Sequence, residues 1–314
     1  MNRRSVWLLA IVFGGFFLLF LIFVGVAFAA LRGQERTEGP TGGPKLGVVV
    51  LKGVIGAKGG IEGRREAEQI YDFARDDEIK GIVVRVDSPG GAVAPSQELN
   101  EEIRRAEKKK KVVCSMGNLA ASGGYYVSVA CDEIVADPGT LTGSIGVISQ
   151  LFAVPDLLSA AKVQETTLKT GALKDAGSPF RPITDQDKAY LNGLIHDIYQ
   201  QFVAAVAAGR HKKVADILPL ADGRVYTGEE AQKLGLIDKI GNFRTAVDEL
   251  MRLSKLHGEP QLVYPVKRNR FLDFLRGDAR AAAREATEGA VEGLEARGGL
   301  QPGILLLAPG LGSR

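Results

Sequence analysis

The chain has little histidine, little cysteine and almost no net charge. Three histidines and two cysteines occur among its 314 residues, and 40 basic side chains against 37 acidic ones leave a formal net charge of +3. A chain that binds nucleic acid would show a basic excess, so we expect no nucleic-acid partner. Cys114 and Cys131 are too few for a disulfide framework or a metal site, and their apolar neighbours predict buried core residues.

The scarcity of histidine restricts the choice of a general base. His196 flanks the apolar stripe of a predicted helix, His211 lies between Arg210 and Lys212, and His257 follows the last predicted helix of the globular region. A base that serves a nucleophilic serine is expected near a turn after a strand, and none of the three lies at such a turn. This distribution argues against a Ser-His-Asp triad.

Residues 1–32 form the first of four parts that differ in composition. Two arginines precede an apolar run at residues 6–31 that contains no charge. This run is longer than the roughly 7–15 residues of a signal-peptide core and can span a bilayer. We therefore expect a cytoplasmic tip and a transmembrane anchor, with the rest of the chain on the extracytoplasmic side. An Ala-Phe-Ala sequence at residues 27–29 resembles a cleavage site, which leaves a removed signal peptide as the alternative.

The other three parts are a linker, a globular domain and an extension. Residues 33–45 are rich in Gly, Pro, Thr and Glu, as expected of a flexible linker. Residues 46–255 carry the apolar periodicity of a folded domain. Residues 256–314 form a C-terminal extension, partly helical or disordered, with a short apolar patch at residues 304–307.

Within the globular domain, apolar segments of strand length alternate with amphipathic segments of helical period. Strands that are apolar throughout imply parallel pairing with helices on both faces, so we expect an α/β fold. Thr184 with Asp187, and Thr227 with Glu230, form capping-box patterns that mark two helix starts. The predicted strands are residues 46–51, 82–86, 111–116, 133–136, 146–151 and 165–169, and the predicted helices are residues 64–75, 99–106, 125–131, 184–202, 227–235 and 242–255.

Ser122 lies between a predicted strand and a predicted short helix, in the sequence Asn-Leu-Ala-Ala-Ser-Gly-Gly-Tyr-Tyr of residues 118–126. Its small neighbours let another backbone approach closely, and the amides that open the helix could stabilise an anion beside the serine. These features suit a nucleophile at a tight turn. A serine that only caps the helix fits the same segment.

A second turn, Asp-Ser-Pro-Gly-Gly at residues 87–91, directly follows a predicted core strand. At the carboxyl end of a parallel strand, paired glycines can present a bare amide to a ligand. The amides of Gly91 and Gly123 could thus form an oxyanion hole, although the turn leaves open which of Gly90 and Gly91 donates. Pro-Gly-Gly is also ordinary turn chemistry.

A serine nucleophile without a histidine needs another base, and Lys174 is the best candidate. It lies in Gly-Ala-Leu-Lys-Asp-Ala-Gly-Ser-Pro, residues 171–179, a loop after the predicted strand at residues 165–169. An ordinary lysine has a pKa of about 10.4, and lowering this pKa by about three units costs about 4 kcal/mol. A dry pocket or a hydroxyl partner must hold the neutral amine, and Ser144 could be that partner. An exposed loop lysine is the alternative.

Five motifs in this order resemble the signal peptide peptidase A family of short, bacterial, membrane-anchored serine proteases. The resemblance covers residues 46–250 and implies a Clp protease and crotonase-like fold of repeated β-β-α units with parallel strands, preceded by one transmembrane helix in the bacterial cell membrane. Residues 46–255 would then be the serine protease domain. The motifs are VDSPGG at residues 86–91, AASGGYY at 120–126, LTGSIGV at 141–147, LKDAGSP at 173–179 and GRVYTGEEAQKLGLID at 223–238.

The resemblance also implies roles for individual residues. Ser122 is the nucleophile, Lys174, 52 residues later, is the general base, Ser144 orients Lys174, and the amides of Gly91 and Gly123 form the oxyanion hole. The family further implies a homo-oligomeric ring in which neighbouring subunits share the Ser-Lys dyad, so that assembly removes the lysine from water. No metal and no cofactor are expected.

The implied function is a serine endopeptidase that degrades hydrophobic peptides, such as cleaved signal peptides, at the membrane and with an alkaline optimum. A crotonase-type acyl-CoA enzyme would share the fold and the oxyanion hole without requiring both Ser122 and Lys174. A catalytically silent scaffold of a membrane protease complex is the other alternative. The patch at residues 304–307 could lie in the peptide groove of a neighbouring copy as a self-inhibitory tail.

Overall fold

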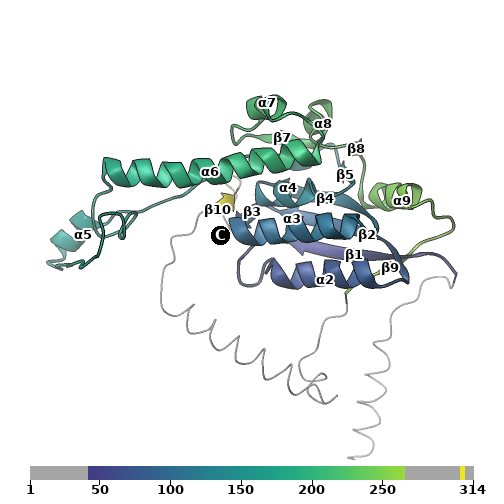
Figure 1. Ribbon diagram of the computed structural model, residues 1–314, viewed down its shortest axis with the longest axis horizontal. Helices are drawn as coiled ribbons and strands as arrows, with labels where there is room; N and C mark the ends of the chain where they lie inside the picture. The colour runs from purple at the N-terminus through teal and green to yellow at the C-terminus, as the bar shows by residue number, and fades with distance from the viewer. Residues whose placement is uncertain (1–41, 266–304, 308–314) are drawn as a thin grey trace, which may run out of the picture. The chain divides into compact units, whose positions relative to one another are not determined.

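An eight-stranded sheet runs through the part of the chain that the computed structural model describes, residues 42–265 and 305–307 (Figure 1). Its strands are β1 (Lys45–Lys52), β2 (Ile79–Ser88), β4 (Lys111–Ala121), β5 (Glu133–Ala136), β6 (Leu141–Gly143), β7 (Val225–Thr227), β8 (Lys239–Ile240) and β9 (Gln261–Val263). The main path is β7-β6-β4-β2-β1-β9, and β5 pairs with both β4 and β8. All these pairs are parallel except β6 with β7. The result is a mixed α/β fold with a largely parallel sheet.

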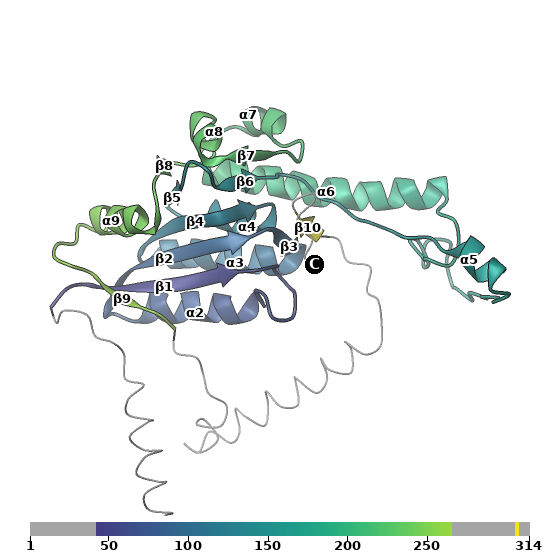
Figure 2. The same ribbon diagram turned by 180° about the vertical axis from the view of Figure 1, so that it is seen from behind.

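Helices cover both faces of this sheet, as Figures 1 and 2 show. Val84 of β2 belongs to a buried cluster with Ile103, on the face covered by α2 (Arg64–Arg75), α3 (Val93–Glu107) and α4 (Gly123–Ser128). The preceding residue of β2, Val83, belongs to a second buried cluster with Leu250 of α9 (Phe243–Leu253). Neighbouring residues of a strand point to opposite faces, so both must be apolar when both faces are covered.

The remaining helices follow β6. They are α5 (Pro155–Ala160), α6 (Asp185–Gly209), α7 (Val214–Ile217), the 3-10 turn η1 (Leu218–Leu220) and α8 (Gly228–Lys233). The predicted caps of α6 and α8 are confirmed, because the side chains of Thr184 and Thr227 accept hydrogen bonds from backbone amides three residues later. The C-terminal part of α6 packs on α4, where the rings of Phe202 and Tyr126 lie 5.1 Å apart. Residues 151–184, here named the arm, extend away from the sheet together with the start of α6 (Figures 1 and 2).

Two predicted strands are wrong. Residues 146–151 form no strand, only an isolated bridge at Ile148, and the pairing with the β7 segment ends where the Gly223 amide donates to the Ile145 carbonyl at 3.1 Å. Residues 165–169 are exposed and have no strand partner within the described residues, so their backbone groups join no ladder. The sequence suggested both strands, but a strand forms only where a neighbouring chain pairs with it.

The ends of the chain lie largely outside the described residues. This holds for the predicted anchor at residues 1–32, and within the described ranges no helix is long and apolar enough to span a membrane. Strand β9 pairs with β1 and lies beyond residue 255, where the sequence suggested that the folded domain ends.

The packing of the central sheet predicts a contrast between two valines on the same sheet face. Val83 is fully buried under α9, whereas Val50 is 44% exposed. We expect Val83→Ala to lower the free energy of unfolding by about 2 kcal/mol or more, because it removes two buried methyl groups and leaves a cavity. Val50→Ala is the matched control and should change it by less than about 0.5 kcal/mol in denaturant titrations. Equal losses in both variants would contradict this packing.

Candidate active site

Strand β4 delivers Ser122 into a strained turn at its carboxyl end. Ser122 has φ 54° and ψ −120°, a conformation that non-glycine residues rarely adopt and that is found mainly where function demands it. Its amide donates to the carbonyl of Gly143 at 2.8 Å, and its carbonyl accepts from the amide of Tyr126 at 2.8 Å. The side chain makes no capping hydrogen bond, so the structure excludes the alternative in which Ser122 only caps α4.

The hydroxyl of Ser122 is buried and has no hydrogen-bond partner within the described part of the chain. Leaving a buried hydroxyl unpaired costs about 1–3 kcal/mol, so proteins rarely do so without a use for the group. Ser122 therefore lies at the N-terminal end of a helix with its side-chain oxygen uncommitted, a position that a nucleophile could use.

Gly91 and Gly123 meet beside this serine. Gly91 belongs to β3 (Gly90–Ala92), which packs so closely on Ile55 that a Cβ at Gly91 would lie 2.0 Å from the Ile55 carbonyl oxygen. A Cβ at Gly123 would lie 3.2 Å from the amide nitrogen of Gly91. The Gly90 amide already donates to the Ser88 hydroxyl at 3.1 Å, so Gly91 is the better oxyanion donor of the pair.

Ser144 lies at the end of the neighbouring strand. Strands β4 and β6 run parallel, with Ala121 opposite Gly143, so Ser122 and Ser144 follow at matching positions of the two strands. Ser144 is buried, and its amide donates to the carbonyl of Arg224 at 2.8 Å. A second hydroxyl therefore stands next to the candidate nucleophile.

The structure does not bring Lys174 to these groups. Lys174 lies exposed in the arm, and no described hydrogen bond or ion pair joins it to Ser122 or Ser144. In both views the arm extends away from α4 and β3 (Figures 1 and 2). One chain thus holds the serine, the second hydroxyl and the two glycine amides together, with the candidate base elsewhere.

An extended segment occupies the free edge of β3. One edge of β3 pairs with Ile55, whose amide donates to Gly90 at 2.9 Å and whose carbonyl accepts from Ala92 at 2.8 Å. The other edge pairs antiparallel with β10 (Leu305–Leu307), which places Leu306 opposite Gly91 (Figure 1). The sequence suggested that this apolar patch lies in the groove of a neighbouring copy, whereas the structure pairs it with β3 of its own chain.

Tyr125, three residues after Ser122, is buried and its hydroxyl is hydrogen-bonded. The Tyr125 hydroxyl donates to the carbonyl of Leu236 at 2.7 Å, and burial raises the pKa of Tyr125, so its phenol stays protonated.

The three histidines are exposed, and His196 contacts Tyr199 and Gln200 of its own helix. Cys114 and Cys131 are buried and free, as predicted. Within residues 42–265 and 305–307, no cluster of histidine, cysteine, aspartate or glutamate is placed to hold a metal ion.

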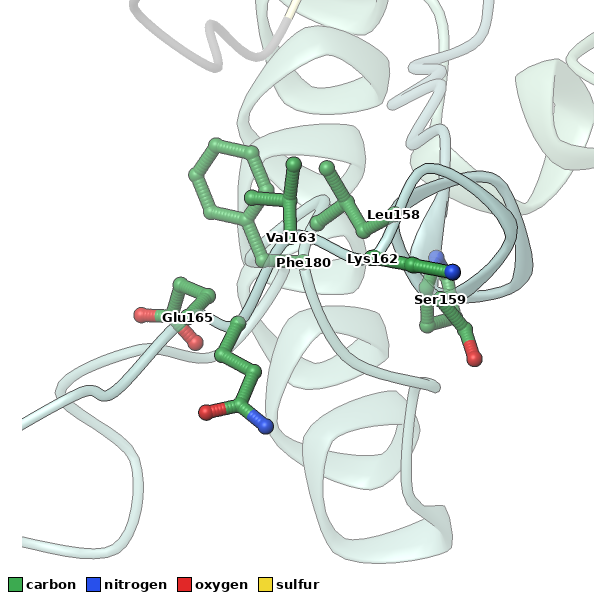
Figure 3. Close-up of a pocket in the computed structure, with 8 residues that line it drawn as sticks. Leu158, Ser159, Lys162, Val163, Glu165 and Phe180 are labelled. Atoms are coloured by element: carbon green, nitrogen blue, oxygen red, sulfur yellow. The ribbon is translucent and has the colours of Figure 1, made fainter.

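The arm contains a hollow that the sequence did not indicate, since no periodic pattern marks it. It has a volume of about 390 Å³ and lies between α5 and the extended chain that follows. Figure 3 shows the apolar side chains of Leu158, Val163 and Phe180 side by side, with Lys162 and Glu165 turned away from them. This hollow is separate from the serine site.

Comparisons with known proteins found the following similarities. Residues 104–257 match the model of peptidase family S49. A Methanocaldococcus jannaschii protein named as an inferred protease, MJ0651, is 39% identical over 64% of this chain and 65% of its own length. An inferred signal peptide peptidase SppA of Enterococcus faecium is 37% identical over 60% of this chain and 55% of its own length. Protease 4 of Salmonella typhi is 35% identical over 81% of this chain and 42% of its own length. The chain thus matches less than two thirds of the length of these relatives.

The close approach at Gly91 predicts that a single methyl group disrupts the site. Gly91→Ala forces β3 away from Ile55 and displaces the amide, so we expect peptidase activity to fall about a hundredfold or more. The control is Gly139→Ala, because a Cβ there meets nothing within 4 Å. Activity would be measured on folded variants checked by circular dichroism. Normal activity in Gly91→Ala would exclude its amide from the site.

Proposed function

We propose that residues 104–257 form a serine protease domain of peptidase family S49. On that premise, the chain is a membrane-anchored serine endopeptidase that degrades hydrophobic peptides such as cleaved signal peptides. The observation that carries the proposal is the buried hydroxyl of Ser122 in a strained turn, which has no hydrogen-bond partner among the described residues and has the Gly91 amide and Ser144 nearby. Relatives named Protease 4 and signal peptide peptidase SppA support the substrate class.

In the proposed mechanism Lys174 acts as the base of a Ser-Lys dyad. Neutral Lys174 Nζ takes the hydroxyl proton while Ser122 Oγ attacks the scissile carbonyl carbon, and the amides of Gly91 and Gly123 stabilise the oxyanion. The protonated lysine then gives its proton to the leaving amine, and an acyl-enzyme remains. Lys174 next deprotonates a water molecule, whose oxygen attacks the ester carbonyl carbon, and the protonated lysine then returns its proton to Ser122 Oγ as the C–O bond to the serine breaks. Because the base must be neutral, activity should increase toward alkaline pH.

The dyad of this proposal is completed between two copies of the chain in a homo-oligomeric ring. The arm that carries Lys174 has no core of its own, since α5 contains no buried residue. Large apolar side chains lie open on it, among them Phe152 at 78% and Leu168 at 93% exposure. Isolated exposed residues are ordinary, but an arm lined with them suits a contact with a second copy. That contact would also remove Lys174 from water.

The same proposal places the chain in the bacterial cell membrane. Residues 1–32 are its anchor, and the catalytic domain lies on the extracytoplasmic side, where hydrophobic peptides remain after secretion. The largely parallel sheet with β3 and α3 following β2 supports the Clp protease and crotonase-like fold of repeated β-β-α units.

The proposal predicts that two inactive variants restore each other. Ser122→Ala and Lys174→Ala should each lower peptide hydrolysis at least about a thousandfold, because nucleophile and base act as a unit. Co-assembly of the two variants in equal amounts should recover activity at about a quarter of the sites, where an intact serine meets an intact lysine from a neighbour. Activity toward a fluorogenic aliphatic peptide would be measured.

Labelling by a fluorophosphonate provides the control. It should modify the wild-type chain and not Ser122→Ala, and an unlabelled wild-type chain would favour a silent scaffold instead. Wild-type hydrolysis by either single variant would refute the dyad. If the mixture stays inactive although each variant assembles, the dyad is not shared between copies.

The pairing of β10 with β3 predicts how substrates bind and how the tail competes with them. We propose that a peptide substrate adds to β3 as an antiparallel strand beside Gly91, at the edge where β10 lies. Truncation after residue 304 should therefore lower KM for peptides several-fold. Truncation after residue 307 keeps β10 and is the matched control. Equal KM values in the two truncated chains would contradict competition by β10.

A further inference from the structure

A single guanidinium joins the loop of Lys174 to the start of α6. Arg181 binds Asp175 through both carboxylate oxygens, with Nε to Oδ2 at 2.9 Å and Nη2 to Oδ1 at 3.0 Å. It also binds both carboxylate oxygens of Asp187, with Nη2 to Oδ1 at 3.0 Å. Two backbone carbonyls, those of Asp175 and Pro182, accept from the same group at 3.2 and 3.1 Å. Because each carboxylate is bound through both of its oxygens, the planar guanidinium fixes the position and the orientation of both.

Both ends of this connection are themselves fixed. Asp187 is buried and forms the capping box of α6 with Thr184, whose amide donates to Asp187 at 3.0 Å and whose hydroxyl accepts from the Asp187 amide at 3.1 Å. Asp175 directly follows Lys174 and also binds Lys169 Nζ at 2.6 Å. The backbone around Lys174 is therefore tied through Arg181 to a helix of 25 residues.

Packing does not replace this polar connection. Residues 161–172 are exposed, α5 buries nothing, and no residue of the loop at residues 171–179 is fully buried. In a loop without a core, hydrogen bonds and charge pairs set the backbone position. Loss of the guanidinium would leave Lys174 on a loop with little else to hold it.

The network also balances charge beside the lysine. The positive charges of Lys169 and Arg181 compensate the negative charges of Asp175 and Asp187. In the first turns of α6, Asp185 forms a separate ion pair with Lys188 at 3.1 Å. The Arg181 guanidinium holds the pKa of Asp175 and of Asp187 well below the usual range, so both carboxylates stay ionised at any pH where a lysine base acts. Without Arg181, the Asp175 carboxylate would be paired with Lys169 alone, and the added negative charge beside Lys174 would oppose the neutral amine that a base needs.

We infer that Arg181 is a positioning residue for Lys174: it holds the lysine loop on α6 and cancels the carboxylate charge next to the base. The inference rests on the proposed function, because it needs Lys174 to be the base. A merely structural role would lower the amount of folded protein or its assembly without changing the pH dependence of the reaction.

The test compares three variants of Arg181 and its partner in the full chain. Arg181→Gln should lower kcat about tenfold or more with KM changed less than about threefold, because the base is misplaced while β3 still binds peptide. The acidic limb of its pH–rate profile should move to higher pH. Arg181→Lys should recover part of kcat, since the charge returns without the planar fork. Arg181→Gln with Asp175→Asn should return the acidic limb toward its wild-type position, because the carboxylate that only Lys169 still pairs is gone.

Arg252→Gln is the matched control. Arg252 binds Glu249 and Glu133 on α9 and β5, far from the arm in the sequence, so its loss should leave kcat and the pH profile unchanged. Unchanged kcat and pH profile in Arg181→Gln would overturn the inference. So would an activity loss that the assembled fraction fully explains. If Arg181→Gln fails to assemble, the pH–rate profile of Arg181→Lys decides. A wild-type kcat and a wild-type pH–rate profile in Arg181→Lys would show that the planar guanidinium is not needed.

Lys174→Ala separates this inference from the proposed function. If Lys174→Ala keeps wild-type activity, the proposed base is wrong and the inference falls with it. If Lys174→Ala is inactive while Arg181→Gln behaves as wild type, the dyad stands and only the role of Arg181 is refuted.

Discussion

Strand β4 shares one of its edges between two partners, and the geometry of the candidate site depends on this arrangement. Its first half pairs with β5, from Val113 opposite Glu133, and its last residues pair with β6, from Leu119 opposite Leu141. The other edge of β4 pairs with β2, from Lys111 opposite Gly81 to Ala120 opposite Ser88, with an irregularity after Met116. Parallel strands end on the same side of a sheet, so the residues that follow β2, β4 and β6 meet at one place. Gly91, Ser122 and Ser144 are these residues.

Close packing of backbone on backbone then shapes the site. The turn at Gly91 leaves no room for a side chain against Ile55, and Gly123 lies nearly as close to Gly91 and to the hydroxyl of Ser96. These glycines allow two amides to approach one point, which bulkier residues would prevent. The strain stored at Ser122 persists because a fully buried sheet and helix hold the turn from both sides.

The arm follows a different physical principle from the sheet. The sheet is held by two apolar clusters, one on each face, whereas the arm buries few side chains and relies on carboxylates that share Arg181. Packed clusters are stable in a single chain. A segment held by polar contacts, with exposed apolar side chains, can adapt to a neighbour, which is compatible with the proposal that Lys174 reaches a site in another copy.

The sequence by itself determined the local features of this protein. Apolar runs and helical periods located the central strands, α2 and α9, two capping boxes located the starts of α6 and α8, and small residues around Ser122 and Gly91 marked tight turns. Each of these depends on residues close together in the chain, where the side-chain pattern and the backbone preference act directly. The wrong strands at residues 146–151 and 165–169 show the limit of such patterns, because pairing requires a partner that the pattern does not name.

Only the tertiary structure decided which distant residues meet. The register of β4 and β6 places Ser144 beside Ser122, the free edge of β3 receives β10, and the arm carries Lys174 away from both serines within one chain. The link from Arg181 to Asp175 and Asp187 likewise depends on how the loop folds back on α6. Such contacts depend on strand register and on the direction in which a loop leaves the sheet, and neither property is written in local periodicity.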